Sequence, residues 1–292
     1  MNELKVKAYA KINLFLEICG RRENGYHEID TVMQTVGLYD RITVDYDEQG
    51  EGITLSCNKK HIPTDESNIA YKCAALFLKE TGKTGGVHIH IDKKIPVAAG
   101  LGGGSADGAA VLKALNRLTD ARLSVTELCD LGKRIGADIP FCIRGGCARA
   151  TGIGEIFEEA PCLCGFVPVI AMGRQGSSTP AAYRALDDAG YQGTATAKPM
   201  LEMLEKQDGR GLVGALYNAF EGVILPVNDG ARELKSKFVK LGAKGTMMSG
   251  SGAAVFGLFE SGAKARFACN ALRLSGNFAV VAPCVKDAFE EG

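Results

Sequence analysis

The sequence has no excess of either charge, because its 292 residues include 34 basic and 34 acidic side chains. A broad nucleic-acid-binding surface normally brings a basic excess, so we expect no nucleic-acid partner. A long hydrophobic run is also missing: the longest candidate, residues 162–172, contains Gly165 and Pro168 and falls short of the roughly 18 residues that span a bilayer. We therefore expect no membrane partner, whereas a small anionic ligand is compatible with a neutral chain.

Features of secreted proteins are missing as well. The N-terminal segment MNELKVKAYAK is charged and alternates in character, unlike a signal peptide. Ten cysteines are scattered along the chain without a C-x-x-C pair, and the spacing of Cys162 and Cys164 does not suit a zinc site. We expect a cytoplasmic protein whose cysteines are reduced and mostly buried as small hydrophobic residues.

The length and the hydrophobic content of 46% indicate two globular units or one large one. In the first half, helices are predicted over residues 68–80, between Ser67 as N-cap and Gly82, and from Ser124, which forms a capping box with Glu127. Period-two alternation predicts strands at residues 5–10, 12–16, 41–46 and 87–91. Strands mixed with helices, without regular βα alternation, are typical of the α+β class.

A second unit is predicted to begin near residues 158–164, where Pro161 interrupts the chain. Thr179 and Pro180 are expected to open a helix as N-cap and first residue. Further helices are expected up to residue 241 and at 263–274, with strands at residues 166–172, 244–248, 253–259 and 278–285. Without its extra helices, this order is the β-α-β-β-α-β arrangement of ferredoxin-like folds.

Glycine is over-represented, with 37 residues, roughly 13% against a usual ~7%. Residues 96–107, PVAAGLGGGSAD, follow a strand and lead into a predicted helix at 108–118. Free backbone N–H groups at such a position bind phosphate well. The segment is neither a Walker A loop, which needs a lysine after the glycines, nor a dinucleotide fingerprint, which needs glycine where Ser105 stands. The alternative to phosphate binding is a plain turn between strand and helix. We disfavour it, because ordering so many glycines on folding costs conformational entropy.

Two weaker signals remain open or are set aside. Residues 249–252, SGSG, could present backbone donors or could simply form a hairpin turn. His88 and His90 share the polar face of a predicted strand. Because no third ligand stands nearby, a solvated face is favoured over a zinc site.

Residues 96–107 resemble the central ATP-binding motif of the GHMP kinases, the family of galactose, homoserine, mevalonate and phosphomevalonate kinases. Residues 7–16 and 249–252 resemble the family's first and third motifs, so that the resemblance covers nearly the whole chain. Within the family, the segments AKINL (10–14), NGYHE (24–28) and GADIPF (136–141) closely match the branch that phosphorylates cytidylated methylerythritol. That branch serves the non-mevalonate route of isoprenoid biosynthesis.

The resemblance implies a two-domain α+β fold. Residues 1–158 would form a ribosomal-protein-S5-domain-2-like unit that binds ATP and carries out catalysis, and residues 159–292 a ferredoxin-like unit with extra helices. The implied ligands are ATP as phosphoryl donor, Mg²⁺ with it, and the cytidylated methylerythritol. Ser105 could help to hold the metal, but no protein metal ligand is assigned, and the oligomeric state is left open.

For the chemical step, the resemblance makes Asp138 the base and Lys11 the cation. A carboxylate can take the proton of the attacking hydroxyl, and a cation can stabilise the alkoxide that develops. From the residues alone, Asp138 could equally be a solvated carboxylate on a turn, and Lys11 an ordinary surface lysine on a strand.

For substrate recognition, the resemblance makes Asn13 a substrate contact and makes Tyr26 and His27 the cytidine-binding pair. An aromatic face and base-edge hydrogen bonds are what a cytosine needs. Tyr183 stands where the family has a second aromatic that sandwiches the base, although a core tyrosine is the alternative. The expected ATP contacts are Pro96, Val97, Ala98, Ala99, Gly100, Leu101, Gly102, Gly103, Gly104, Ser105 and Ala106, with looser matches at Asn68 and Lys94.

The sequence departs from the family pattern at a few positions. Gly108 stands where alanine is more common, which is expected to loosen the start of the helix. Ala253 and Ala254 replace a more polar pair, so fewer donors are expected there. Two rival functions stay open: another GHMP enzyme such as mevalonate kinase or diphosphomevalonate decarboxylase, and a non-catalytic nucleotide-binding protein. The Tyr26–His27 pair argues against the first, and Lys11 with Asp138 against the second.

Overall fold

The computed structural model describes residues 2–23 and 25–286. Three parts of the chain lie outside the described residues: residue 1, Asn24 of the NGYHE segment, and residues 287–292 at the end of the second predicted unit. In the described part of the chain, no helix is both long and apolar enough to cross a membrane.

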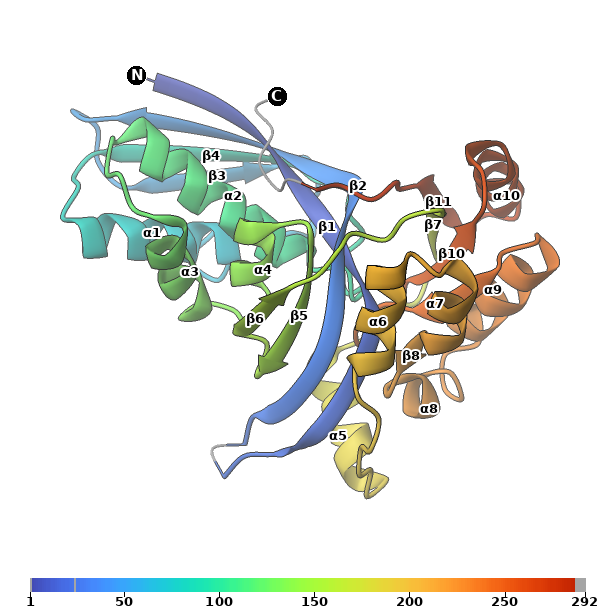
Figure 1. Ribbon diagram of the computed structural model, residues 1–292. Coiled ribbons are helices and arrows are strands. Elements are labelled where there is room, and N and C mark those ends of the chain that lie inside the picture. The colour runs from blue at the N-terminus through green and yellow to red at the C-terminus, as the bar shows by residue number, and fades with distance from the viewer. Residues whose placement is uncertain (1, 24, 287–292) are drawn as a thin grey trace.

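A seven-stranded sheet forms the framework of the N-terminal unit (Figure 1). Its centre is a long antiparallel hairpin of β1 (Asn2–Arg21) and β2 (His27–Asp47). The strand order is β3-β4-β2-β1-β8, and β5 and β6 branch from β2. The remaining strands are β3 (Ile53–Cys57), β4 (Gly86–Asp92), β5 (Cys147–Gly152), β6 (Ile156–Glu159) and β8 (Tyr217–Asn218).

Four helices cover one face of the hairpin and of β4 and form a continuous apolar core with it. They are α1 (Ile69–Thr81), α2 (Gly103–Leu118), α3 (Val125–Lys133) and α4 (Ile139–Arg144). The predicted capping box of Ser124 and Glu127 is confirmed at the start of α3. Gly108 does not loosen α2: a Cβ there would lie 2.8 Å from the Cys73 sulfur, so glycine allows α2 to approach α1 closely.

The hairpin corrects the prediction of two separate strands at its start. β1 is one strand with irregular pairing between Tyr9 and Lys11, between Asn13 and Phe15, and between Ile18 and Gly20. Such bulges redirect side chains while the strand continues. The polar interruptions in the sequence pattern therefore mark bulges in one strand.

Three helix starts also differ from the prediction. The N-cap of α1 is Asn68, whose side chain accepts from the Ala70 N–H, because the Ser67 hydroxyl is bonded to Asp65 instead. Helix α2 begins at Gly103, inside the predicted loop, because tertiary packing overrides the poor helix propensity of glycine. Helix α5 has Ser178 as N-cap, so Thr179 and Pro180 are its first two residues.

The C-terminal unit has the predicted ferredoxin-like arrangement. Its four-stranded antiparallel sheet has the order β11-β7-β10-β9. Helices pack on the sheet and, in the case of α6 and α7, beside the N-terminal hairpin (Figure 1). The strands are β7 (Val167–Met172), β9 (Gly245–Met248), β10 (Val255–Phe259) and β11 (Phe278–Val281). The helices are α5 (Thr179–Asp188), α6 (Lys198–Lys206), α7 (Gly209–Ala215), α8 (Glu221–Ile224), α9 (Asp229–Lys240) and α10 (Gly262–Leu274).

Most cysteines are buried or partly buried, and the two paired histidines lie on the same face of β4. All ten cysteines are free; five are buried and three are partly buried. Burial raises the pKa of the Cys73 and Cys142 thiols to about 12. His88 and His90 bond through Nδ1 to hydroxyl groups of β3, and no cluster of three or more potential metal ligands is found among the described residues.

Candidate active site

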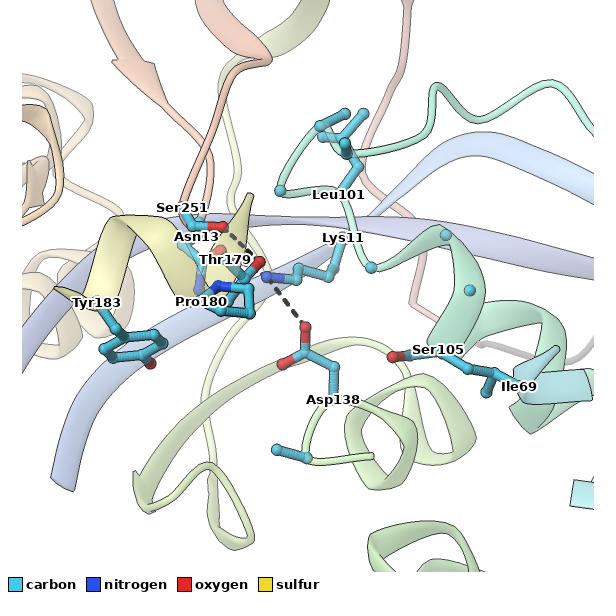
Figure 2. Close-up of a pocket in the computed structure, with 18 of the residues that line it drawn as sticks. Lys11, Asn13, Ile69, Leu101, Ser105, Asp138, Thr179, Pro180, Tyr183 and Ser251 are labelled. Carbon is cyan, nitrogen blue, oxygen red and sulfur yellow. Dashed lines mark hydrogen bonds and ion pairs between the residues drawn. The ribbon is translucent and has the colours of Figure 1, made fainter. Parts of the chain in front are cut away.

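A cavity of about 810 Å³ opens between the two units. Its walls come from the β1–β2 hairpin, the glycine segment with the start of α2, the start of α4, helix α5 and the turn between β9 and β10. Figure 2 shows how side chains from these distant segments converge. We call the part around Lys11 and Asp138 the lysine end, and the part around Tyr26, His27 and Tyr183 the aromatic end.

Lys11 is buried, with 5% of its surface exposed, although it is a charged residue on a strand. Its Nζ donates to Asn13 Oδ1 at 2.8 Å and lies 3.4 Å from Asp138 Oδ2. Asp138 is the N-cap residue of α4, but its side chain makes no capping bond and points toward Lys11 across the cavity (Figure 2). Its side chain keeps 36% of its surface exposed. The pair is therefore neither a surface lysine nor an isolated turn carboxylate.

A chain of buried hydrogen bonds holds Asn13 in place. Asn13 Nδ2 donates to Thr31 Oγ1 at 2.8 Å, and Thr31 Oγ1 donates to the Phe15 carbonyl at 2.6 Å. The backbone N–H of Asn13 also donates to Ser249 Oγ, at 3.3 Å. Because each partner is anchored in turn, Lys11 has a fixed acceptor and little freedom to turn away from Asp138.

The glycine segment leads into the N-terminus of α2, where backbone N–H groups lack partners within the helix. Gly102, the N-cap of α2, has φ of +69° and offers no side chain to cap the helix. The first N–H groups of a helix have no partner within it, so those of the first turn remain available to an anion. The positive end of the helix dipole adds to this preference. Residues 96–105 line the cavity, whereas Ala106 is buried behind them.

The same segment is fastened to the C-terminal unit. The Ala254 N–H donates to the Ala99 carbonyl at 3.1 Å, and Ser249 Oγ donates to the Gly100 carbonyl at 3.0 Å. A Cβ on Gly100 would lie 1.9 Å from the Ser249 carbonyl oxygen, and φ of Gly100 is +73°. Glycine is therefore required at this position by both space and backbone conformation.

The aromatic end combines the hairpin tip with helix α5. Tyr26 is 59% exposed at the tip. The His27 ring stacks on Tyr183 with centroids 4.5 Å apart, and Phe220 meets Tyr183 edge-on at 5.0 Å. Burial, with a smaller contribution from the charge of Asp138, raises the pKa of the Tyr183 hydroxyl. Tyr183 is a partly buried tyrosine that packs against the core and also lines the cavity.

A buried charge cluster lies behind the glycine segment. Lys93 Nζ bonds to Asp40 Oδ2 at 2.7 Å and to Asp107 Oδ2 at 2.5 Å. Asp40 also accepts from the backbone N–H groups of Lys94 and Ile95. Burial raises the pKa of Asp107 well above its usual range, and the charge of Asp40 adds to this, while Lys93 opposes it. The cluster therefore anchors the chain just before the glycine segment.

The looser sequence matches have different surroundings. Asn68 lines the cavity and also caps α1. The Lys94 side chain instead lies over the Tyr39 ring and lines a second cavity of about 630 Å³. Cavity residues that sequence reasoning missed include Arg21, Thr31, Lys93 and Asp187. No motif marks them, because their partners lie far away in the sequence.

Comparison with known proteins gives matches over both units. Residues 68–146 match the family model "GHMP kinases N terminal domain", and residues 200–277 match "GHMP kinases C terminal". A solved homoserine kinase from Cytophaga hutchinsonii superposes with a TM-score of 0.82 at 18% identity, covering 100% of this chain and 98% of that one. The likeness to that structure concerns the fold alone.

The chain belongs to the GHMP kinase family, whose members take their phosphoryl group from ATP. Within it, the chain groups with the 4-diphosphocytidyl-2-C-methyl-D-erythritol kinases. It is 42% identical to the enzyme of that name from Alkaliphilus metalliredigens over 268 residues, 92% of each chain. A crystal structure of 4-(cytidine 5'-diphospho)-2C-methyl-D-erythritol kinase, at 35% identity, superposes with a TM-score of 0.79 and covers 96% of this chain and 99% of that one.

Proposed function

We propose that this chain transfers the γ-phosphate of ATP to the 2-hydroxyl of 4-diphosphocytidyl-2-C-methyl-D-erythritol, giving the 2-phosphate and ADP in the non-mevalonate route to isoprenoids. The observation that carries the proposal is the Lys11–Asp138 pair, 3.4 Å apart, in one cavity with the uncapped N-terminus of α2 and with an aromatic end. The 42% identity to a kinase of that name supports the choice of substrate.

In the chemical step, Asp138 accepts the proton of the substrate's 2-hydroxyl group. The oxygen of that hydroxyl group forms a bond to the γ-phosphorus. The bond from the γ-phosphorus to the bridging oxygen breaks, and ADP leaves with the electron pair. Lys11 stabilises the negative charge that develops on the attacking oxygen. Because Lys11 also donates to Asn13, the ammonium group stays in position while Asp138 becomes neutral.

The phosphates of ATP are bound by residues 96–105, chiefly through the backbone N–H groups at the start of α2. Ala106 is left out, because it is buried and its N–H donates to the Gly102 carbonyl. Asn68, which lines the cavity, contacts the adenosine of ATP. Lys94 is proposed as a second adenosine contact, although its side chain lines the neighbouring cavity.

Mg²⁺ accompanies the nucleotide and neutralises phosphate charge when it is bound. The donors that face this part of the cavity, the Ser105 hydroxyl and the Asp138 carboxylate, are oxygen ligands of the kind that Mg²⁺ prefers (Figure 2). With so few protein ligands, the ion would be held mainly through ATP.

The cytidine group binds at the aromatic end. Tyr26 provides an exposed ring for stacking, and His27 provides a base-edge hydrogen bond. Tyr183, which stacks on the His27 ring and lines the cavity, is the second aromatic for the base, and Asn13 contacts the polyol near the lysine end.

The proposal includes a division into an ATP-binding and catalytic unit at residues 1–158 and a ferredoxin-like unit at 159–292. Between β6 and β7 the chain passes from the first sheet to the second, and only the two-residue strand β8 returns to the edge of the first sheet. It also includes a cytoplasmic location, as expected of an enzyme that consumes ATP and a nucleotide-linked intermediate.

The test is a coupled ADP-release assay with Mg²⁺ and three alcohols: the cytidylated methylerythritol, mevalonate and homoserine. We expect turnover with the first alone. Turnover only with mevalonate or homoserine would assign a different member of the family, and ATP binding without turnover of any alcohol would favour a non-catalytic nucleotide-binding protein.

A further inference from the structure

Helix α5 forms one wall of the aromatic end, but its own apolar face is small. Of its ten residues, only Ala182 and Leu186 are buried. Tyr183 stacks on His27, and Asp187 Oδ1 lies 2.7 Å from His27 Nε2. Helices in proteins are stabilised chiefly by packing of an apolar face. With so few buried residues, the position of α5 must depend strongly on polar contacts at its ends.

The loop between α5 and α6, residues 189–197, is bound to the hairpin by Glu17. The backbone N–H of Tyr191 donates to a carbonyl in the last turn of α5 at 3.0 Å, so this residue is tied directly to the helix. The Tyr191 hydroxyl donates to Glu17 Oε1 at 2.6 Å and also lies 2.6 Å from the Tyr217 hydroxyl. The Ala195 N–H donates to Glu17 Oε2 at 3.0 Å. Both oxygens of Glu17 therefore hold the α5–α6 loop.

Asp30, the partner of Glu17 in the register of the hairpin, is a second anchor for the same loop. Its Oδ2 accepts from the Ala197 N–H at 2.9 Å, and the Arg149 guanidinium donates to both of its oxygens. Glu17 and Asp30 are buried, with 1% and 6% of their surface exposed. A buried carboxylate is costly unless hydrogen-bond donors surround it. The α5–α6 loop supplies a share of those donors to each carboxylate.

The loop crosses the face of the hairpin that is turned away from the cavity. Leu16 and Thr31 line the cavity, and successive residues of a strand point to opposite faces, so Glu17 and Asp30 point to the other face. Figure 1 shows the chain passing from α5, beside the hairpin, up to α6. A Cβ on Gly193 would lie 2.5 Å from the Glu17 carboxyl carbon, so glycine allows the close approach. The hairpin is therefore held between α5 on one face and the loop on the other.

We propose that Glu17 is a positioning residue for substrate binding: together with Tyr191 it holds the α5–α6 loop behind the hairpin, and this fixes α5 and its Tyr183 at the aromatic end. The inference rests on the proposed function, since it concerns a substrate that occupies the aromatic end. The proposed ATP contacts lie on the glycine segment, and Lys11 has its own buried network. The Glu17 contacts should therefore determine the KM for the cytidylated substrate, and not the KM for ATP or the rate of the chemical step.

The main test is Tyr191→Phe, which keeps the ring but removes the hydroxyl that bonds to Glu17. The loss of one hydrogen bond corresponds to about 2–10-fold, so we expect the KM for the cytidylated substrate to rise by that factor. The KM for ATP and the single-turnover rate at saturating substrate should stay within about twofold of wild type. Glu17→Ala removes both acceptors and should raise the same KM further. Glu17→Gln keeps one oxygen acceptor and should restore part of the affinity lost in Glu17→Ala.

Tyr71→Phe is the matched control, because Tyr71 is a partly buried tyrosine of α1 that packs on the core of the N-terminal unit. It should leave all three constants unchanged. If Tyr191→Phe raised both KM values equally, or slowed the single-turnover rate without changing the KM for the cytidylated substrate, the α5–α6 loop would have only a general structural role, and the inference would be overturned. Failure of the wild-type protein to phosphorylate the cytidylated substrate would instead overturn the proposed function.

A second measurement needs no substrate and therefore separates the two outcomes. Hydrogen exchange followed by mass spectrometry reports how readily a segment opens. In Tyr191→Phe we expect the backbone amides of residues 179–197 to exchange about 2–10-fold faster than in wild type, because one hydrogen bond no longer holds the segment. Residues 103–118 of α2 should exchange at an unchanged rate. An unchanged rate over residues 179–197 would show that the Glu17 contact does not hold α5, which would contradict the inference whatever the substrate is.

Discussion

The lysine end and the aromatic end of the cavity are built on the same hairpin, but they are held in different ways. At the lysine end, Lys11 and Asn13 are buried and lie at bulges of β1, where a continuous chain of hydrogen bonds fixes them. At the aromatic end, Tyr26 is exposed at the hairpin tip, and His27 depends on contacts with α5 of the other unit.

The difference suits the role that we propose for each end. Phosphoryl transfer needs charges in fixed positions, and a buried network supplies them without reorganisation. Recognition of a base needs a surface that opens to admit the ligand, so exposed rings and an ion pair between units are suitable there. Changes at the lysine end should therefore act on the rate of the chemical step, and changes at the aromatic end on substrate binding.

The largest effect is expected from Asp138→Asn, which removes the proposed proton acceptor at the lysine end. General-base assistance contributes about 10²–10⁴ in rate, so the single-turnover rate should fall by that factor. ATP binding should persist, because we propose that the phosphates contact the glycine segment and not Asp138. The control is Asp130→Asn, an exposed residue on α3. A nearly unchanged single-turnover rate in Asp138→Asn would show that Asp138 is not the base.

Gly100→Ala tests whether the lysine end depends on the contact between the two units. The new Cβ would collide with the Ser249 carbonyl oxygen, 1.9 Å away, in a left-handed backbone conformation. We expect a loss of about 2–4 kcal/mol in the free energy of unfolding, measured by urea denaturation, together with a raised KM for ATP. Gly214→Ala is the control, because no atom lies within 4 Å of a Cβ there. Equal stability of the two variants would contradict the packing argument.

Tyr26→Ala tests the aromatic end. Stacking of a base on an aromatic ring contributes about 1–3 kcal/mol, so the cytidylated substrate should bind more weakly by that amount in calorimetry. ATP affinity and thermal stability should stay near wild type, because Tyr26 is 59% exposed. Tyr26→Phe keeps the ring and should restore binding. Equal weakening of both ligands would indicate that Tyr26 supports the fold instead.

The smallest effect is expected from Thr31→Val, which sharpens the comparison by weakening the network one step away from Lys11. The variant keeps the shape of the side chain but removes the acceptor of Asn13 Nδ2. A lost hydrogen bond of this kind contributes about 0.5–1.5 kcal/mol, so turnover should fall roughly 2–10-fold with an unchanged KM for ATP. Thr31→Ser keeps the hydroxyl and should stay near wild type. A change only in the KM for the cytidylated substrate would show that Thr31 affects substrate binding and not the chemical step, which would contradict the comparison.

The local features of the fold could be predicted from the sequence because they depend on neighbouring residues. Period-two alternation located β4, much of β1 and only the last part of β2, at residues 41–46, and the capping box located the start of α3. The β-α-β-β-α-β order of the second unit was also predictable. Boundaries were missed where packing outweighs propensity, as at Gly103, where α2 begins within the glycine segment.

The sequence by itself determined which residue types are available for the chemistry: the glycine segment, Lys11, Asp138 and the Tyr26–His27 pair. Only the tertiary structure decided that Lys11 is buried against Asn13, that Ser249 supports Asn13 across 236 residues, and that Asp187 meets His27 across 160. The physical reason is that a motif records local backbone and side-chain chemistry, whereas burial, orientation and pairing arise from contacts between segments that only folding brings together.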